Sequence, residues 1–189
     1  MKVDIARMTS GASPTGFAEA LTGQGGQVRW QVLDDPTSRS GKVIAETSRD
    51  TADYRFPLCI YQDFNRDNVT VAIRFKPVDG EVDRAGGIIV RAVDANNYYV
   101  ARANALEDNV RLYKVVGGVR RQIAGSNLEV ATGAWHALTL RIANDDIEVW
   151  FNNFRVIKLR DQSLSGPGRV GLWTKADSLT HFAEFAINP

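Results

Sequence analysis

Apolar and polar residues alternate along most of the chain, and a period of two is typical of strands that bury one face. The 3.6-residue period of an amphipathic helix hardly occurs. The alternation predicts about a dozen strands, at 27–33, 42–47, 56–61, 68–77, 87–94, 97–104, 109–116, 119–124, 135–143, 146–152, 154–160, 168–174 and 179–187. A helical turn near Gly16 to Leu21 is the one helical element expected, within an otherwise irregular N-terminal segment of residues 1 to about 25.

Short strands separated by turn residues predict an all-β fold, an antiparallel sandwich or jelly roll with almost no helix. The segment from Gly86 to Lys114 shows this best. There Asn96 and Asn97 lie between two apolar runs, and asparagine tolerates the left-handed backbone of tight hairpins. No linker, composition shift or internal repeat divides the 189 residues, so we expect a single domain over 1–189.

The alternation also assigns faces, because residues two apart share a side of a strand. The predicted core positions are apolar: Val69, Val71, Ile73, Phe75, Ile88, Val90, Ala92, Tyr99, Ala101, Ala103, Ile147, Val149, Phe151, Val170 and Leu172. The predicted outward positions carry arginine, amide, lysine and tryptophan side chains: Arg91, Arg102, Asn104, Trp150, Trp173 and Lys175. Flat aromatic rings and hydrogen-bonding side chains together suit a sugar ring, so this set is a candidate ligand-binding face. The alternative is ordinary cross-strand pairing and packing.

Two acidic residues in turns extend this candidate site. Glu107 follows the strand that contains Arg102, and Asp177 follows Trp173 and Lys175. If these strand ends meet, they form a polar cluster bordered by Trp173, comprising Arg102, Asn104, Glu107, Lys175 and Asp177. Such a cluster could hold a sugar, or cleave a glycosidic bond with Glu107 or Asp177 as weak catalytic candidates. It could equally be a network of ion pairs, Arg102 with Glu107 and Lys175 with Asp177.

Composition narrows the partners. The formal net charge is +1, with basic and acidic residues interleaved, so we expect no nucleic-acid partner. No apolar run approaches the roughly 20 residues of a membrane span, and we expect no membrane insertion. The N-terminal residues lack the apolar core of a secretory signal. The single Cys59 excludes an intrachain disulfide, and its apolar surroundings predict a buried, inert thiol.

Three motifs carry a resemblance to a known fold family. AGGIIVRAVDANNYYVARANALEDNVRLYK, WHALTLRIANDDIEVWFNN and GRVGLWTKADS resemble the concanavalin A-like lectin/glucanase jelly roll. Within it they are similar to the bacterial group described as laminin-G-like or as a 3-keto-disaccharide hydrolase-like domain of unknown function. The resemblance spans roughly Trp30 to Ile187. It implies a two-sheet jelly-roll sandwich that binds carbohydrate on a concave face, in a periplasmic or secreted location. It implies no particular reaction. We expect no cofactor, but calcium is possible because sandwiches of this fold frequently bind it, and Asp34 and Asp35 are the candidate ligands.

The glucanase branch of the family requires paired carboxylates, which an E-x-D-x-x-E strand supplies. Here Glu81 and Asp83 are followed by Gly86 in place of the last glutamate, and the segment follows a turn. Family 16 glucanase activity is therefore disfavoured. The sequence predicts a carbohydrate-binding protein. The alternatives are a glycoside hydrolase-like enzyme of undefined chemistry and a laminin-G-like protein-interaction or adhesion domain. The oligomeric state stays open.

Overall fold

The computed structural model describes all 189 residues and contains fourteen strands and one 3-10 turn, η1 (Ile5–Arg7). The strands are β1 (Phe17–Gly23), β2 (Trp30–Asp34), β3 (Lys42–Glu46), β4 (Arg55–Arg66), β5 (Val69–Asp79), β6 (Ala85–Asp94), β7 (Asn97–Asn104), β8 (Asn109–Val116), β9 (Val119–Asn127), β10 (His136–Ala143), β11 (Asp146–Phe151), β12 (Phe154–Arg160), β13 (Gly168–Trp173) and β14 (Leu179–Asn188). The chain has no helix with the length and apolar character of a membrane span.

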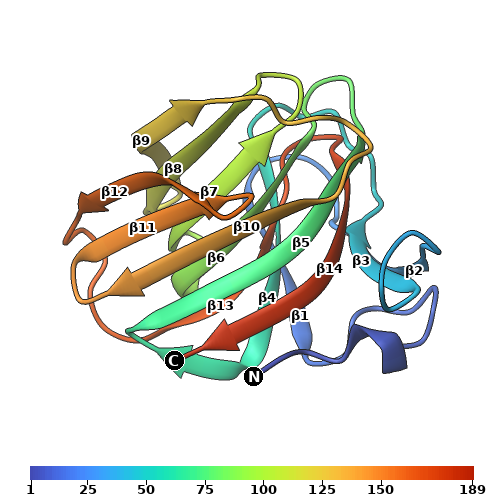
Figure 1. The fold of residues 1–189 in the computed structure, drawn as a ribbon, viewed down its shortest axis with the longest axis horizontal. Helices are drawn as coiled ribbons and strands as arrows, with labels where there is room; N and C mark the ends of the chain where they lie inside the picture. Colours follow the sequence, from blue (N-terminus) through green and yellow to red (C-terminus); the bar gives the residue numbers. More distant parts are fainter.

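The strands form two antiparallel seven-stranded sheets that pack face to face (Figure 1). The order in one sheet, here called the groove sheet, is β1-β4-β13-β6-β7-β8-β9. The order in the other, the back sheet, is β12-β11-β10-β5-β14-β3-β2, so β14 lies between β5 and β3. This architecture confirms the predicted all-β class and the two-sheet jelly-roll sandwich.

The core between the sheets confirms the predicted faces. Its 34 buried residues include every apolar position that the alternation assigns inward except Ala92. The irregularity at Arg91 turns Ala92 to the other face of its sheet, where it belongs to a separate hydrophobic cluster. Large side chains from both sheets meet there, such as Phe75 of β5 and Tyr99 of β7, each with no exposed surface. Cys59 lies in the same core, and burial raises the pKa of its thiol well above the usual range. The period of two therefore reports the side of each strand that faces the opposite sheet.

The N-terminal prediction is wrong. Residues 17–23 form the edge strand β1 instead of a helical turn, and pair with β4 from Phe17 opposite Tyr61 to Gly23 opposite Arg55. This edge strand has exposed and partly buried residues on both faces, so its sequence lacks a regular alternation of apolar and polar residues. Its conformation is decided by pairing with β4. The first residues are also tied down. The Met1 amino group donates a hydrogen bond to the Ile187 carbonyl at 2.7 Å.

The groove sheet is strongly curved. Thr22 of β1 and Tyr98 of β7 lie four strand spacings apart, about 19 Å in a flat sheet. Their side-chain oxygens are nevertheless 2.8 Å apart. The Tyr54 hydroxyl, next to β4, likewise donates to the Gly118 carbonyl at the start of β9, over 3.0 Å. The face that carries these residues is therefore concave. A second hydrophobic cluster of 11 buried residues fills its centre.

Candidate functional site

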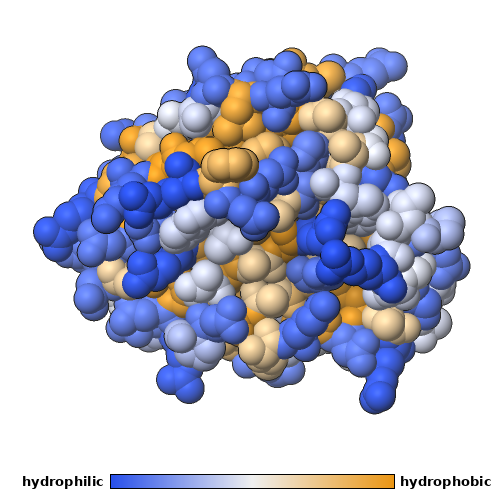
Figure 2. All heavy atoms as spheres, in the orientation of Figure 1, coloured by the Kyte–Doolittle hydropathy of each residue, from blue (hydrophilic) through white to orange (hydrophobic).

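The structure separates the two tryptophans that were candidates for one aromatic platform. Trp150 lies on the outer face of the back sheet, with Thr139 and Arg155 as its cross-strand partners. Trp173 ends β13 in the groove sheet. Figure 2 shows the outer face of the back sheet as hydrophilic side chains interspersed with hydrophobic ones, without one continuous apolar surface. The alternation correctly predicts that both indoles point away from the core. Because the two residues belong to different sheets, the structure places them on opposite sides of the molecule.

Arg91 also lies apart from the other candidates. It has a positive φ of 49° at an irregularity in the pairing of β6 with β7. Such a bulge re-aims the side chain relative to the regular alternation. The Arg91 guanidinium donates to the carbonyls of Asp67 at 2.9 Å, Leu164 at 2.8 Å and Asn144 at 2.5 Å. Arg91 thereby links three turns, and the residue is 4 % exposed.

The other candidates meet at one end of the concave face. Gly87 of β6 lies between them in the hydrogen-bonded ladder, opposite Arg102 on one side and Trp173 on the other. A Cβ atom at Gly87 would lie 3.0 Å from the Arg102 Cβ atom. Glycine is needed there because a Cβ atom would also lie 2.7 Å from the Ala101 carbonyl oxygen, which is too close for packing. We call the linked polar residues at this end of the concave face the Arg102 cluster, comprising Arg102, Asn104, Glu107, Asn109, Tyr113, Asp53, Asp83 and Lys175.

The predicted ion pair between Arg102 and Glu107 is present. The Arg102 guanidinium donates to the Glu107 carboxylate at 2.7 Å, to the Tyr113 hydroxyl at 3.1 Å and to the Asn109 side-chain oxygen. Burial raises the pKa of Glu107, but the Arg102 charge and the Asn109 hydrogen bond outweigh it, so the net pKa is lowered. The Arg102 side chain is 5 % exposed and that of Glu107 is 49 % exposed. The pair therefore presents an ionised acceptor to solvent.

The predicted pair between Lys175 and Asp177 does not form. The Lys175 ammonium contacts Asp53 at 2.6 Å and Asp83 at 2.9 Å instead. The reason is that the Asp177 carboxylate is already occupied by the turn that precedes β6. It accepts backbone N–H groups from Glu81 at 2.7 Å and from Asp83 at 3.0 Å.

These backbone hydrogen bonds define the role of Asp177. Burial raises its pKa, but the donors from the turn lower it more, and the net pKa is below the usual range. A carboxylate that accepts several N–H groups stays ionised and holds the turn in place. Asp177 thus orders residues 81–83, which places the Asp83 side chain in the cluster.

Asp83 is a site residue that the sequence singles out only as part of the incomplete glucanase motif. Its carboxylate accepts from the Asn104 amide at 2.9 Å and pairs with Lys175, and the residue is 3 % exposed. Burial raises its pKa, and the hydrogen bond and charge of Lys175 only partly offset the effect. The pairing of β6 with β7 places it there, because Ala85 lies opposite Asn104 and brings the preceding residues beside β7.

Trp173 is the floor of this site and has no exposed surface. Its ring stacks on Phe56, with centroids 5.6 Å apart and an interplanar angle of 15°. Arg120 of β9 covers both rings. Its guanidinium carbon is 4.4 Å from the centre of the Phe56 ring and 4.4 Å from that of Tyr113. The expected open indole platform is thus a covered one, because the curvature brings β9 back over β4.

The calcium candidates do not fit a metal site. The Asp35 carboxylate contacts the Lys76 ammonium at 2.6 Å and the His181 ring at 2.7 Å, so cationic and ring nitrogens occupy the oxygens that calcium would need. Asp34 accepts from the Ser10 hydroxyl at 2.6 Å. No group of three or more His, Cys, Asp or Glu side chains is arranged to hold a metal ion.

Asp35 is expected to make stability depend on pH in the acid range. Burial raises its pKa, but hydrogen bonds from Lys76, Thr37 and His181 lower it more, and the pKa lies well below its usual range. An unfolded aspartate titrates near 3.9, so this stabilisation is complete above about pH 5 and is lost as pH falls toward the folded pKa. Asp35→Asn should therefore lose most stability at pH 7, with a smaller difference at pH 3. Urea denaturation at pH 7 and pH 3 measures the difference in the free energy of unfolding between the variant and the wild type. Asp63→Asn is the control, because Asp63 is exposed. A difference that does not shrink in acid would contradict the assignment.

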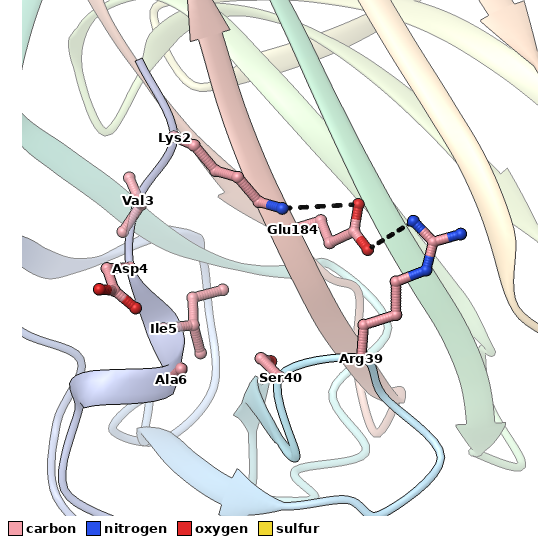
Figure 3. A pocket seen from close by; sticks show the side chains of 8 residues that line it. All are labelled: Lys2, Val3, Asp4, Ile5, Ala6, Arg39, Ser40 and Glu184. Carbon is pink, nitrogen blue, oxygen red and sulfur yellow. Dashed lines mark ion pairs between the residues drawn. The ribbon is translucent and has the colours of Figure 1, made fainter.

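A pocket lies away from this cluster, between the N-terminal segment and the turn at residues 39–40. It has a volume of about 450 Å³ and an open mouth (Figure 3). The Glu184 carboxylate spans it, 3.9 Å from the Lys2 ammonium and 3.4 Å from the Arg39 guanidinium. The charged side chains that line this pocket therefore neutralise one another. None of the lining residues belongs to the Arg102 cluster.

The sheet order, the curved groove sheet and the core between the sheets define a concanavalin A-like jelly roll. Similar solved structures carry the same fold. The carbohydrate binding module CBM66 from Bacillus subtilis is 22 % identical with a TM-score of 0.70, over 89 % of this chain and 96 % of that one. A Bacillus subtilis protein of unknown function with a galectin-like fold is 11 % identical with a TM-score of 0.62, over 90 % and 88 %. A putative glycosyl hydrolase from Parabacteroides distasonis is 16 % identical with a TM-score of 0.56, over 85 % and 98 %.

No family model matches the sequence, and no curated protein matches it. At identities of 22 % or less, the likeness to solved structures establishes the fold. The function has to be inferred from the residues of the site.

Proposed function

We propose that the protein binds carbohydrate through the Arg102 cluster on the concave face of the groove sheet. The observation that carries this proposal is the convergence of donors and acceptors from β7, β8 and the turns beside β4, β6 and β13 at one end of the concave face, with stacked aromatic rings beneath. The fold of a carbohydrate binding module adds support.

The chemistry of the cluster suits a polyhydroxylated ligand. Each sugar hydroxyl can donate one hydrogen bond and accept two. Glu107 is 49 % exposed and Asp53 is 77 % exposed at the side chain, so both offer ionised acceptors to a ligand. Arg102 and Lys175 hold these carboxylates from behind, which fixes their direction. Hydrogen bonds to charged acceptors are the stronger kind, and a preordered set loses little side-chain entropy on binding.

The same residues favour binding over hydrolysis. Hydrolysis by paired carboxylates needs one of them to hold a proton that it gives to the leaving oxygen. The pKa values of Glu107 and Asp177 are both lowered, so neither catalytic candidate carries that proton at neutral pH. The glucanase motif also has no room for its last glutamate, since a Cβ atom at Gly86 would lie 2.7 Å from the Thr180 methyl group.

Glu107→Gln is expected to weaken glycan binding about tenfold, because the substitution removes one charge-assisted hydrogen bond while keeping the shape of the side chain. A glycan array selects the ligand, and isothermal titration calorimetry measures its affinity. Glu129→Gln is the matched control, because Glu129 is exposed and its side chain makes no hydrogen bond or ion pair. Absence of binding to any glycan, or equal affinity in Glu107→Gln and the wild type, would overturn the proposal.

A further inference from the structure

Arg120 is a cationic residue of the groove that makes no ion pair within the protein. It enters from the edge strand β9, and its guanidinium lies between the Phe56 and Tyr113 rings, with the Trp173 ring centre 5.8 Å away. Its backbone N–H donates to the Tyr54 hydroxyl at 3.3 Å, which fixes the start of the strand. The planar head is therefore held in one orientation by aromatic rings.

The hydrogen-bonding groups of Arg120 are unused. Its guanidinium makes no hydrogen bond or ion pair within the protein, and Nη1 is buried without a partner. Nε and Nη2 are not enclosed in this way, and they form the edge of the guanidinium that binds a carboxylate side-on through two parallel hydrogen bonds.

The neighbouring cations are already neutralised. Arg102 is paired with Glu107, and Lys175 is paired with Asp53 and Asp83. Asp53 is the carboxylate whose pKa the charge of Arg120 helps to lower, but its first partner is Lys175. A cation that is partly withdrawn from water without a counter-charge is costly, and a ligand that supplies the charge relieves that cost.

We propose that Arg120 recognises the carboxylate of an acidic sugar, so that the ligand of the groove is a glycan containing uronate residues. This inference rests on the proposed carbohydrate-binding function and specifies its ligand class. The uronate carboxylate lies against the Nε–Nη2 edge of Arg120, while hydroxyls of the same or the adjacent sugar contact Glu107 and the rest of the Arg102 cluster.

The test compares oligouronides of several linkages with the same oligosaccharides after reduction of each carboxylate to a hydroxymethyl group. Titration calorimetry of the whole protein is expected to show an affinity at least about tenfold higher for an oligouronide than for its reduced form. Arg120→Met keeps an unbranched aliphatic side chain over the rings and should bring this ratio to within about twofold. Arg120→Lys keeps the charge without the fork and should retain only part of the preference. Thermal denaturation establishes that both variants are folded.

The outcomes separate the two proposals. If wild-type protein binds both forms equally and Glu107→Gln weakens both, the carbohydrate site stands and the role of Arg120 is overturned. An unchanged preference in Arg120→Met also overturns it. The role of Arg120 is also overturned if Arg120→Met binds the reduced form more tightly than the wild type does. Arg120 would then only shield the Phe56 and Trp173 rings from the ligand. If no glycan, acidic or neutral, binds the wild type, the proposed function itself fails.

Discussion

Replacing Trp173 with alanine is expected to lower the free energy of unfolding by about 3–5 kcal/mol, the usual cost of removing a large buried aromatic side chain. The indole has no exposed surface and stacks on Phe56 in the second hydrophobic cluster. Its removal leaves a cavity that Arg120, held by two further contacts at 4.4 Å, cannot fill without leaving Phe56 and Tyr113. Urea denaturation followed by circular dichroism measures the loss.

Trp150→Ala is the matched control for this substitution. Trp150 lies on the outer face of the back sheet and is only partly buried, so its removal is expected to cost about 1 kcal/mol or less. Similar losses in the two variants would contradict the placement of Trp173 in a packed cluster. The comparison also shows why Trp173→Ala is a poor probe of ligand binding. A loss of affinity in that variant would reflect the loss of packing as much as the loss of a ligand contact.

Arg55→Met is expected to cost about 3–5 kcal/mol, because it leaves the buried carboxylate of Glu46 without a positive partner. The side chains of Arg55 and Glu46 both have no exposed surface, and their closest charged atoms are 3.6 Å apart. The Arg55 guanidinium also donates to the Ser48 hydroxyl at 2.8 Å and to the Ala176 carbonyl at 3.4 Å. It therefore ties the segment after β3 to the segment that carries Lys175. Thermal and urea denaturation measure the effect.

A double variant distinguishes charge from packing in this pair. Glu46→Gln keeps an acceptor for the Arg29 backbone N–H, which donates to the Glu46 carboxylate at 2.9 Å. Arg55→Met combined with Glu46→Gln should therefore be more stable than Arg55→Met alone, since no buried charge remains. If the double variant is equally or less stable, the main role of Arg55 is in its hydrogen bonds to the surrounding loops.

The fold could be predicted from the sequence because most strands bury one face, and burial on one face imposes a period of two. Phe75 and Leu172 illustrate the relation, since their neighbours along the strand face away from the core. The edge strand β1 escaped prediction for the same reason. It exposes residues on both faces, and its conformation comes from pairing with residues about forty positions later in the chain, such as Tyr61 opposite Phe17.

The site could be predicted only where its contacts are local. The Arg102–Glu107 pair joins residues separated by one turn, and it forms as expected. The Lys175–Asp177 pair fails because the backbone N–H groups of a distant turn occupy Asp177. Alternation correctly assigns Trp173 to the face away from the core between the sheets. It carries no information on curvature, and curvature is what places Arg120 over that face.

The position of β14 between β5 and β3 has a consequence for how the chain folds. The last of the fourteen strands lies within the back sheet, and the β2–β3 pair joins that sheet only through it. The back sheet cannot be completed until residues 179–188 have been synthesised, and until then β5 and β3 have unpaired edges. Folding should therefore follow synthesis, in the milliseconds-to-seconds range of sandwiches dominated by long-range pairing.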